Sequence, residues 1–86
     1  MVEKLVTVVN ETGLHARPAA EFVKYAKSFK DKISLVKDDK VLNAKSILHL
    51  LSLSLRKGDQ FIIRAEGDSE EDTSDKMIKF VQDLKE

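Results

Sequence analysis

The residues best suited to chemistry in this chain are His15 and Arg17, which are separated by one alanine. Neutral imidazole is a nucleophile, and a guanidinium group binds oxyanions through parallel hydrogen bonds. An apolar, β-branched stretch ends before them at Thr12-Gly13, and Pro18 follows where the first turn of a helix would begin. We therefore predict that His15 lies at or near the N-cap of a helix.

This position favours the binding and transfer of an oxyanion, most naturally a phosphate. The first N–H groups of a helix have no intrahelical acceptor, and the helix dipole places positive charge there. That charge disfavours the protonated imidazole and so favours the nucleophilic form, and it also stabilises a phosphoryl group attached to the ring. Residue types and spacing alone leave a second interpretation equally open, in which His15 is an ordinary cap beside a surface arginine.

Length and composition limit the classes of protein to consider. The 86 residues, 42% hydrophobic and 35% charged, predict one domain over residues 1–86 with a thin core. Lys plus Arg and Asp plus Glu are 15 each, so we expect no nucleic-acid partner. The absence of cysteine excludes disulfides and thiolate metal sites. No signal peptide or membrane-spanning run is recognisable, which favours a cytoplasmic protein without membrane insertion.

Hydrophobic periodicity predicts four strands and three helices. Because each helix has an apolar side, the simplest packing places the helices on one face of an antiparallel sheet. The third strand is short and lysine-rich, which is typical of a sheet edge. In chain order the predicted elements are a strand at Val2–Val9, a helix from Ala16 to about Lys27, strands at Ile33–Lys37 and Lys40–Leu42 joined by a turn at Asp38-Asp39, a short helix after Ser46, a strand at Gln60–Glu66, and a helix from about Ser69 to about Lys85.

The short helix after Ser46 is apolar around much of its circumference. Ser46 is a natural N-cap, and Ile47, Leu48, Leu50 and Leu51 follow within five positions. Either the fold covers all of these side chains, or some remain exposed and contact a partner. We take Leu48 and Leu51 as the candidates for exposure.

The motif Gly13-Leu14-His15-Ala16-Arg17-Pro18-Ala19, the segment Lys45-Ser46-Ile47 and the chain length together resemble the HPr family. HPr is the histidine-containing phosphocarrier of the bacterial sugar phosphotransferase system. The resemblance covers essentially the whole chain. It implies an α+β fold, an open-faced β-sandwich in which a four-stranded antiparallel sheet carries three helices on one face, in the order βαββαβα.

The resemblance also implies a function for the His15 motif. Enzyme I, charged by phosphoenolpyruvate, would phosphorylate His15 on Nδ1, and the group would pass to EIIA proteins or domains. Arg17 would bind the phosphoryl oxygens, and the backbone N–H groups of Ala16 and Arg17 would help to hold them. Such a protein is a covalently phosphorylated carrier and not an enzyme, and we expect a monomer without cofactor or metal.

By analogy with the family, the partners would bind a docking surface around His15. Lys24, Lys27 and Arg56 would steer this surface toward acidic partners. Besides Arg17, the predicted docking residues are Ala20, Lys24, Lys27, Ile47, Leu48, His49, Leu51, Ser52 and Arg56.

Ser46 is a second candidate site, for regulation. In family members from Gram-positive and some other bacteria, the matching serine is phosphorylated by HPr kinase/phosphorylase, and that form can act as a corepressor for catabolite control protein A. A phosphate on Ser46 would add a charge of about −1.5 to −2 at a helix start and should slow transfer from Enzyme I. The alternative is that Ser46 is only a cap, contributing about 1 kcal/mol.

The chain departs from the family pattern at His49, Ser54 and Arg56, where many members have glycine. We therefore predict that the second helix continues to about Leu55 and closes near Gly58. The departures would alter the rim of the docking surface and with it the choice of partner. We do not expect His49 to form a metal site with the motif histidine, since no carboxylate or thiol stands at ligand spacing.

Two other functions stay open at this point. The chain could be a regulatory phosphocarrier, similar to the nitrogen-related branch, without a direct role in sugar uptake. It could instead be an interaction module in which His15 is vestigial. The intact His15, Arg17 and Pro18 argue against the module, and the Lys45-Ser46 pair favours the sugar branch over the nitrogen branch.

Overall fold

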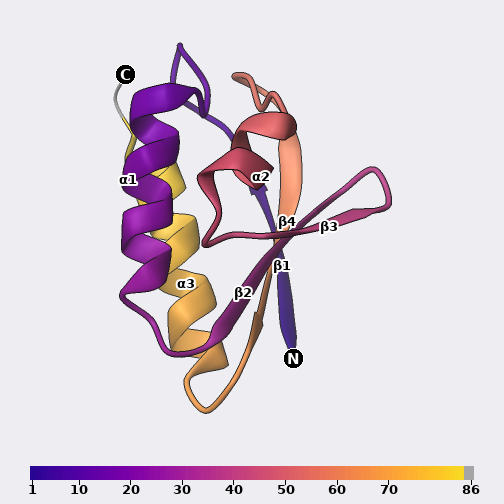
Figure 1. Ribbon diagram of the computed structural model, residues 1–86, viewed down its shortest axis with the longest axis vertical. Coiled ribbons are helices and arrows are strands. Elements are labelled where there is room, and N and C mark those ends of the chain that lie inside the picture. The colour runs from indigo at the N-terminus through magenta and orange to yellow at the C-terminus, as the bar shows by residue number, and fades with distance from the viewer. Residues whose placement is uncertain (85–86) are drawn as a thin grey trace.

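The computed structural model describes residues 1–84 and contains the seven predicted elements in the predicted order (Figure 1). No helix within this range is both long and apolar enough to cross a membrane. The elements are β1 (Val2–Thr7), α1 (Ala16–Lys27), β2 (Lys32–Lys37), β3 (Lys40–Asn43), α2 (Ile47–Ser52), β4 (Gln60–Glu66) and α3 (Glu70–Gln82).

The strands form one antiparallel sheet in the order β1-β4-β2-β3. The central strand β4 alternates as its sequence predicts, with Phe61, Ile63 and Ala65 buried on the same face. In register with them lie Val6 of β1, opposite Phe61, and Leu35 of β2, opposite Ile63. β3 lies at the sheet edge, and the turn before it has positive φ angles at both aspartates, as a two-residue hairpin requires.

The three helices cover the buried face of this sheet (Figure 1). Each contributes side chains without solvent exposure, among them Phe22 from α1, Leu50 from α2 and Met77 from α3. Among residues 1–84, no helix lies on the other face of the sheet. The predicted open-faced β-sandwich is therefore confirmed.

The prediction that α2 continues to about Leu55 is wrong, because the helix ends at Ser52. The reason lies two residues later, where Ser54 has a φ of +49° and cannot continue a right-handed helix. Gly58 does not close α2 either. It lies in the turn before β4, where its N–H donates to the carbonyl of Val8 over 2.8 Å.

Two other elements end earlier than predicted. β1 ends at Thr7 instead of Val9, and Val8 pairs instead with the turn before β4, since its N–H donates to the carbonyl of Asp59 over 2.9 Å. α3 ends at Gln82, whereas the predicted end near Lys85 lies outside the described residues.

Candidate functional site

The loop between β1 and α1 turns sharply before the His15 motif. Gly13 has a φ of +68°, a conformation that side chains disfavour, and its N–H donates to the carbonyl of Asn10 over 3.2 Å. The Asn10 side chain closes the same turn, because its Nδ2 donates to the carbonyl of Gly13 over 2.8 Å. These bonds fix the direction in which the chain enters α1.

His15 is the N-cap of α1, as predicted. Its backbone is extended, with a φ of −94°, and its carbonyl accepts the first helical hydrogen bond from Ala19 over 2.8 Å. The N–H of Ala16 therefore has no acceptor within the helix, and Pro18 has no N–H. His15 is exposed, and its side chain makes no capping hydrogen bond. The imidazole thus stands at the positive end of the helix, where it is accessible to a partner.

Arg17 lies in the first turn of the same helix. Its side chain is 76% exposed, and its Nε is 4.0 Å from Oε1 of Glu21, one turn further on. An ion pair that exposed contributes little to stability and is readily exchanged for another anion. Ala20, Lys24 and Lys27 follow Arg17 at three- and four-residue spacing, and all are exposed. The predicted docking residues of α1 therefore form one exposed stripe along the helix.

α2 packs beside α1 and supplies the apolar part of the predicted docking surface. Leu50 is fully buried, whereas Leu48 is 77% exposed and Ile47 and Leu51 are 37% exposed each. The predicted exposure of Leu48 and Leu51 is confirmed. The sequence did not separate Ile47 from the core, because a six-residue helix is too short for its periodicity to decide a marginal position.

The side chains of Ser46 and Ser52 bond to the backbone of α2, whereas His49 bonds to the end of β3. Ser46 is the N-cap, as predicted, and its Oγ accepts the N–H of His49 over 3.4 Å. Ser52 donates its hydroxyl to the carbonyl of His49 over 2.6 Å. His49 is exposed, and its Nδ1 accepts the N–H of Asn43 over 3.3 Å. Within residues 1–84, no group of three or more His, Cys, Asp or Glu could hold a metal ion.

Lys45 anchors the start of α2 to the loop between α1 and β2. Its Nζ donates to the carbonyls of Phe29 and Asp31 over 2.9 and 3.0 Å. Asp31 is itself buried, and its Oδ2 accepts the hydroxyl of Thr73 from α3 over 3.0 Å. The position of Ser46 is thus fixed by contacts that reach across the helical layer.

A hollow of 330 Å³ lies beside the His15 side chain. It joins the start of α1 to the end of α2 and to the segment that follows α2. Since Leu51 borders this hollow and comes five residues after Ser46, Ser46 lies about 7.5 Å away from Leu51 along the helix axis. The lining residues are Thr12, Leu14, His15, Leu51, Ser54, Leu55 and Arg56.

Sequence reasoning named three of these lining residues as docking or phosphoryl-binding groups, namely His15, Leu51 and Arg56. It also named Ser54 as a departure that alters the rim of the docking surface, and it missed Thr12, Leu14 and Leu55 because backbone contacts bring the two loops together. The N–H of Leu14 donates to the carbonyl of Leu55 over 2.9 Å, and any residue type can make such a bond. The only local signal was Gly13, which permits the close approach: a Cβ there would lie 2.4 Å from the Leu55 oxygen.

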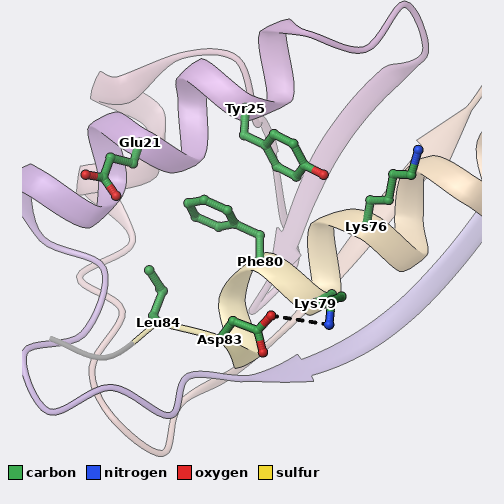
Figure 2. A pocket seen from close by; sticks show the side chains of 7 residues that line it. All are labelled: Glu21, Tyr25, Lys76, Lys79, Phe80, Asp83 and Leu84. Carbon is green, nitrogen blue, oxygen red and sulfur yellow. Dashed lines mark ion pairs between the residues drawn. The ribbon is translucent and has the colours of Figure 1, made fainter.

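A second hollow, of 450 Å³, lies between α1 and α3 (Figure 2). Its floor is aromatic, since the rings of Tyr25 and Phe80 are stacked with their centroids 5.3 Å apart. Lys79 and Asp83 form an ion pair at its rim, 3.5 Å apart. It is lined by none of the predicted site residues, whereas His15, Leu51 and Arg56 line the hollow beside the start of α1.

Comparison with known proteins places this geometry in a family. The family profile described as "PTS HPr component phosphorylation site" matches residues 2–83. The HPr-like protein Crh of Halalkalibacterium halodurans is 44% identical over 82 residues, which are 95% of this chain and 98% of that protein.

Two solved structures show the same fold. The phosphocarrier protein HPr of Bacillus anthracis has a TM-score of 0.90 and 41% identity, covering 94% of this chain and 96% of that one. Crh of Bacillus subtilis has a TM-score of 0.76 and 41% identity, covering 100% and 99% of the two chains, and its structure is described as a swapped dimer.

Proposed function

The chain belongs to the HPr family, whose members are phosphocarriers and not enzymes, and we propose that it carries a phosphoryl group on His15. The group would come from phospho-Enzyme I and pass to EIIA proteins or domains. In the first transfer a bond forms between Nδ1 of His15 and phosphorus, while the bond from phosphorus to the donor breaks and its electron pair leaves with the donor. The second transfer is the same step with His15 as the donor.

The observation that carries this proposal is the exposed imidazole at the N-cap of α1. Phosphoryl transfer needs mainly positioning and stabilisation of negative charge, which a small protein supplies with few groups. The backbone N–H of Ala16 and the guanidinium of Arg17 would bind the phosphoryl oxygens, and the helix dipole adds to their effect. Because the ring is accessible, a larger partner could reach it from outside.

The test is to incubate the protein with Enzyme I and labelled phosphoenolpyruvate, and to compare wild type with His15→Ala. Wild type should take up acid-labile label, since a phosphorus–nitrogen bond hydrolyses in acid, and the variant should take up none. Label that persists in His15→Ala would exclude His15 as the acceptor.

We extend the proposal to the surface around His15 through which the partners would bind. An apolar patch from α2 lies beside a basic stripe from α1, and this combination suits acidic partners with an apolar centre. The docking surface as proposed consists of Ala20, Lys24, Lys27, Ile47, Leu48, His49, Leu51, Ser52 and Arg56, every one of them exposed.

We also propose that Ser46 is a regulatory site that is phosphorylated by an HPr kinase/phosphorylase, and that catabolite control protein A binds the phosphorylated form. Its place at the start of α2 supports this, since a phosphate there would be stabilised by the helix start and would add negative charge to the docking surface. Ser46→Asp should slow transfer from Enzyme I. Ser69→Asp is the matched control, because Ser69 caps α3 and lies outside the docking surface. Equal slowing in both variants, or none in Ser46→Asp, would count against the site.

A regulatory role without sugar uptake is the second candidate function. It is favoured by the likeness to Crh, one of whose solved structures carries the description "catabolite repression containing protein". The nitrogen-related branch is the other form of this alternative. The two roles separate experimentally, because a sugar carrier must pass phosphate from His15 to an EIIA protein, whereas a regulator need not.

We further propose that the protein is a cytoplasmic monomer, since its proposed donor is charged by a cytoplasmic metabolite. The swapped dimer of Bacillus subtilis Crh makes the oligomeric state worth measuring. Size-exclusion chromatography with light scattering should give a mass near 9.7 kDa. A mass of twice that value would reject the monomer.

A further inference from the structure

We propose that Arg56 is a second guanidinium group for the phosphoryl group on His15, acting on it together with Arg17. This inference rests on the proposed carrier function and goes beyond the docking role suggested for Arg56 above. The feature that carries it is the hollow of 330 Å³ that His15 and Arg56 both line.

The backbone of Arg56 is held against the loop that leads to His15. Its N–H donates to Oδ2 of Asp59 over 2.9 Å, and its carbonyl accepts the N–H of Asp59 over 2.9 Å. A Cβ on Gly13 would lie only 2.9 Å from the Cα of Arg56. The Cα of Arg56 is therefore held beside Gly13, which precedes His15 by two residues in the sequence.

The charge of the hollow suits an anion. Within residues 1–84, its lining contains two groups that can carry positive charge, His15 and Arg56, and no carboxylate. Among the described residues, the arginine ion pairs join Arg17 with Glu21 and Arg64 with Glu3, and none involves Arg56. A guanidinium in this position binds two phosphoryl oxygens at once, which a lysine cannot do.

The hollow also has room for the group that would be bound. The remaining lining is apolar or neutral, and Ser54 and Thr12 add hydroxyl groups that can donate to oxygen. In the transfer step the phosphorus–nitrogen bond of the donor breaks as the bond to Nδ1 of His15 forms. Arg56 would bind the oxygens that carry the negative charge throughout, without itself gaining or losing a proton.

The experiment follows the ¹⁵Nε–¹Hε signal of Arg56 by NMR, before and after His15 is phosphorylated with Enzyme I and phosphoenolpyruvate and the product is purified. A hydrogen bond to the phosphoryl group should move this signal downfield. Lys24→Ala is the matched control, because Lys24 is a proposed docking cation that does not border the hollow. The Arg56 signal should move in this variant as in wild type.

Kinetics give the second measurement. Arg56→Ala should lower the rate of transfer from Enzyme I about five- to tenfold, and Arg56→Lys should restore only part of the loss. A phosphorylated wild type whose Arg56 signal does not move overturns the inference and leaves the carrier function intact. A wild type that Enzyme I does not phosphorylate rejects the carrier function, and with it the role of Arg56.

Discussion

Replacing Ser54 with glycine should raise the free energy of unfolding by about 0.5 to 1 kcal/mol. Ser54 has a φ of +49°, and a residue with a Cβ in this left-handed region costs about 1–2 kcal/mol. Glycine removes that cost but gives back about 0.5–1 kcal/mol, because it gains more conformational freedom in the unfolded chain. For 86 residues the entropy of unfolding is about 0.18 kcal/mol/K. The net gain therefore corresponds to a rise in Tm of about 3–6 °C.

Urea and thermal unfolding followed by circular dichroism measure this difference directly. Ser52→Gly is the matched control, since it makes the same chemical change two residues earlier, inside α2. There the backbone is helical, and the hydroxyl donates to the carbonyl of His49, so glycine should lower the free energy of unfolding by about 0.5–1 kcal/mol.

The opposite signs of the two variants are the essential result. A Ser54→Gly protein no more stable than wild type would show that the left-handed conformation at this position costs nothing. A stabilised Ser52→Gly protein would show that a glycine after Leu51 helps for some other reason. Either outcome would refute the explanation given for the early end of α2.

Three further predictions concern the anchoring, the electrostatics and the docking surface. Lys45→Ala should lower the free energy of unfolding in urea by about 1.5–3 kcal/mol, because a charged donor to two partly buried carbonyls is lost; a loss below about 0.5 kcal/mol would contradict this. The pKa of Glu11 lies below its usual 4.5 because Lys57 donates a hydrogen bond to it, so its stabilising effect is present above pH 4.5 and is lost as the pH falls through the lowered value. Titration by ¹³C NMR should show the Glu11 pKa rising toward 4.5 in Lys57→Gln, and an unchanged value would exclude the pair as the cause. Leu48→Ala should change stability by less than about 0.5 kcal/mol but raise the KM for Enzyme I about fivefold. Leu50→Ala should instead lower the free energy of unfolding by about 2–5 kcal/mol. Similar losses in the two variants would contradict the exposure of Leu48.

Much of the fold was predictable because its signals are local. The alternation in Gln60–Glu66 identifies a strand with one buried face, and that strand is found with the same bounds. The pattern around His15 and Pro18 identifies a helix start in the same way. Such patterns depend only on neighbours in sequence and need no knowledge of what they pack against.

The rest depended on contacts between distant segments or on a single backbone angle. No residue type in the sequence indicates that the carbonyl of Leu55 accepts the N–H of Leu14. This hydrogen bond brings the neighbouring Arg56 to the hollow beside His15. The end of α2 was misjudged because a serine rarely adopts a positive φ, and nothing in its neighbours predicted that Ser54 would. The end of α2 was therefore mispredicted because the backbone is strained at Ser54, and lining residues were missed where two loops meet through main-chain atoms.

The hydrogen bonds at Asp31 link the start of α2 to α3. Lys45 holds its carbonyl from one side and Thr73 holds its carboxylate from the other, so one short loop fastens both the beginning of α2 and the body of α3. A shift of either helix relative to this loop would strain or break a hydrogen bond to Asp31. The position of α2, which carries part of the proposed docking surface, is thus set partly by Asp31, a buried residue outside that surface.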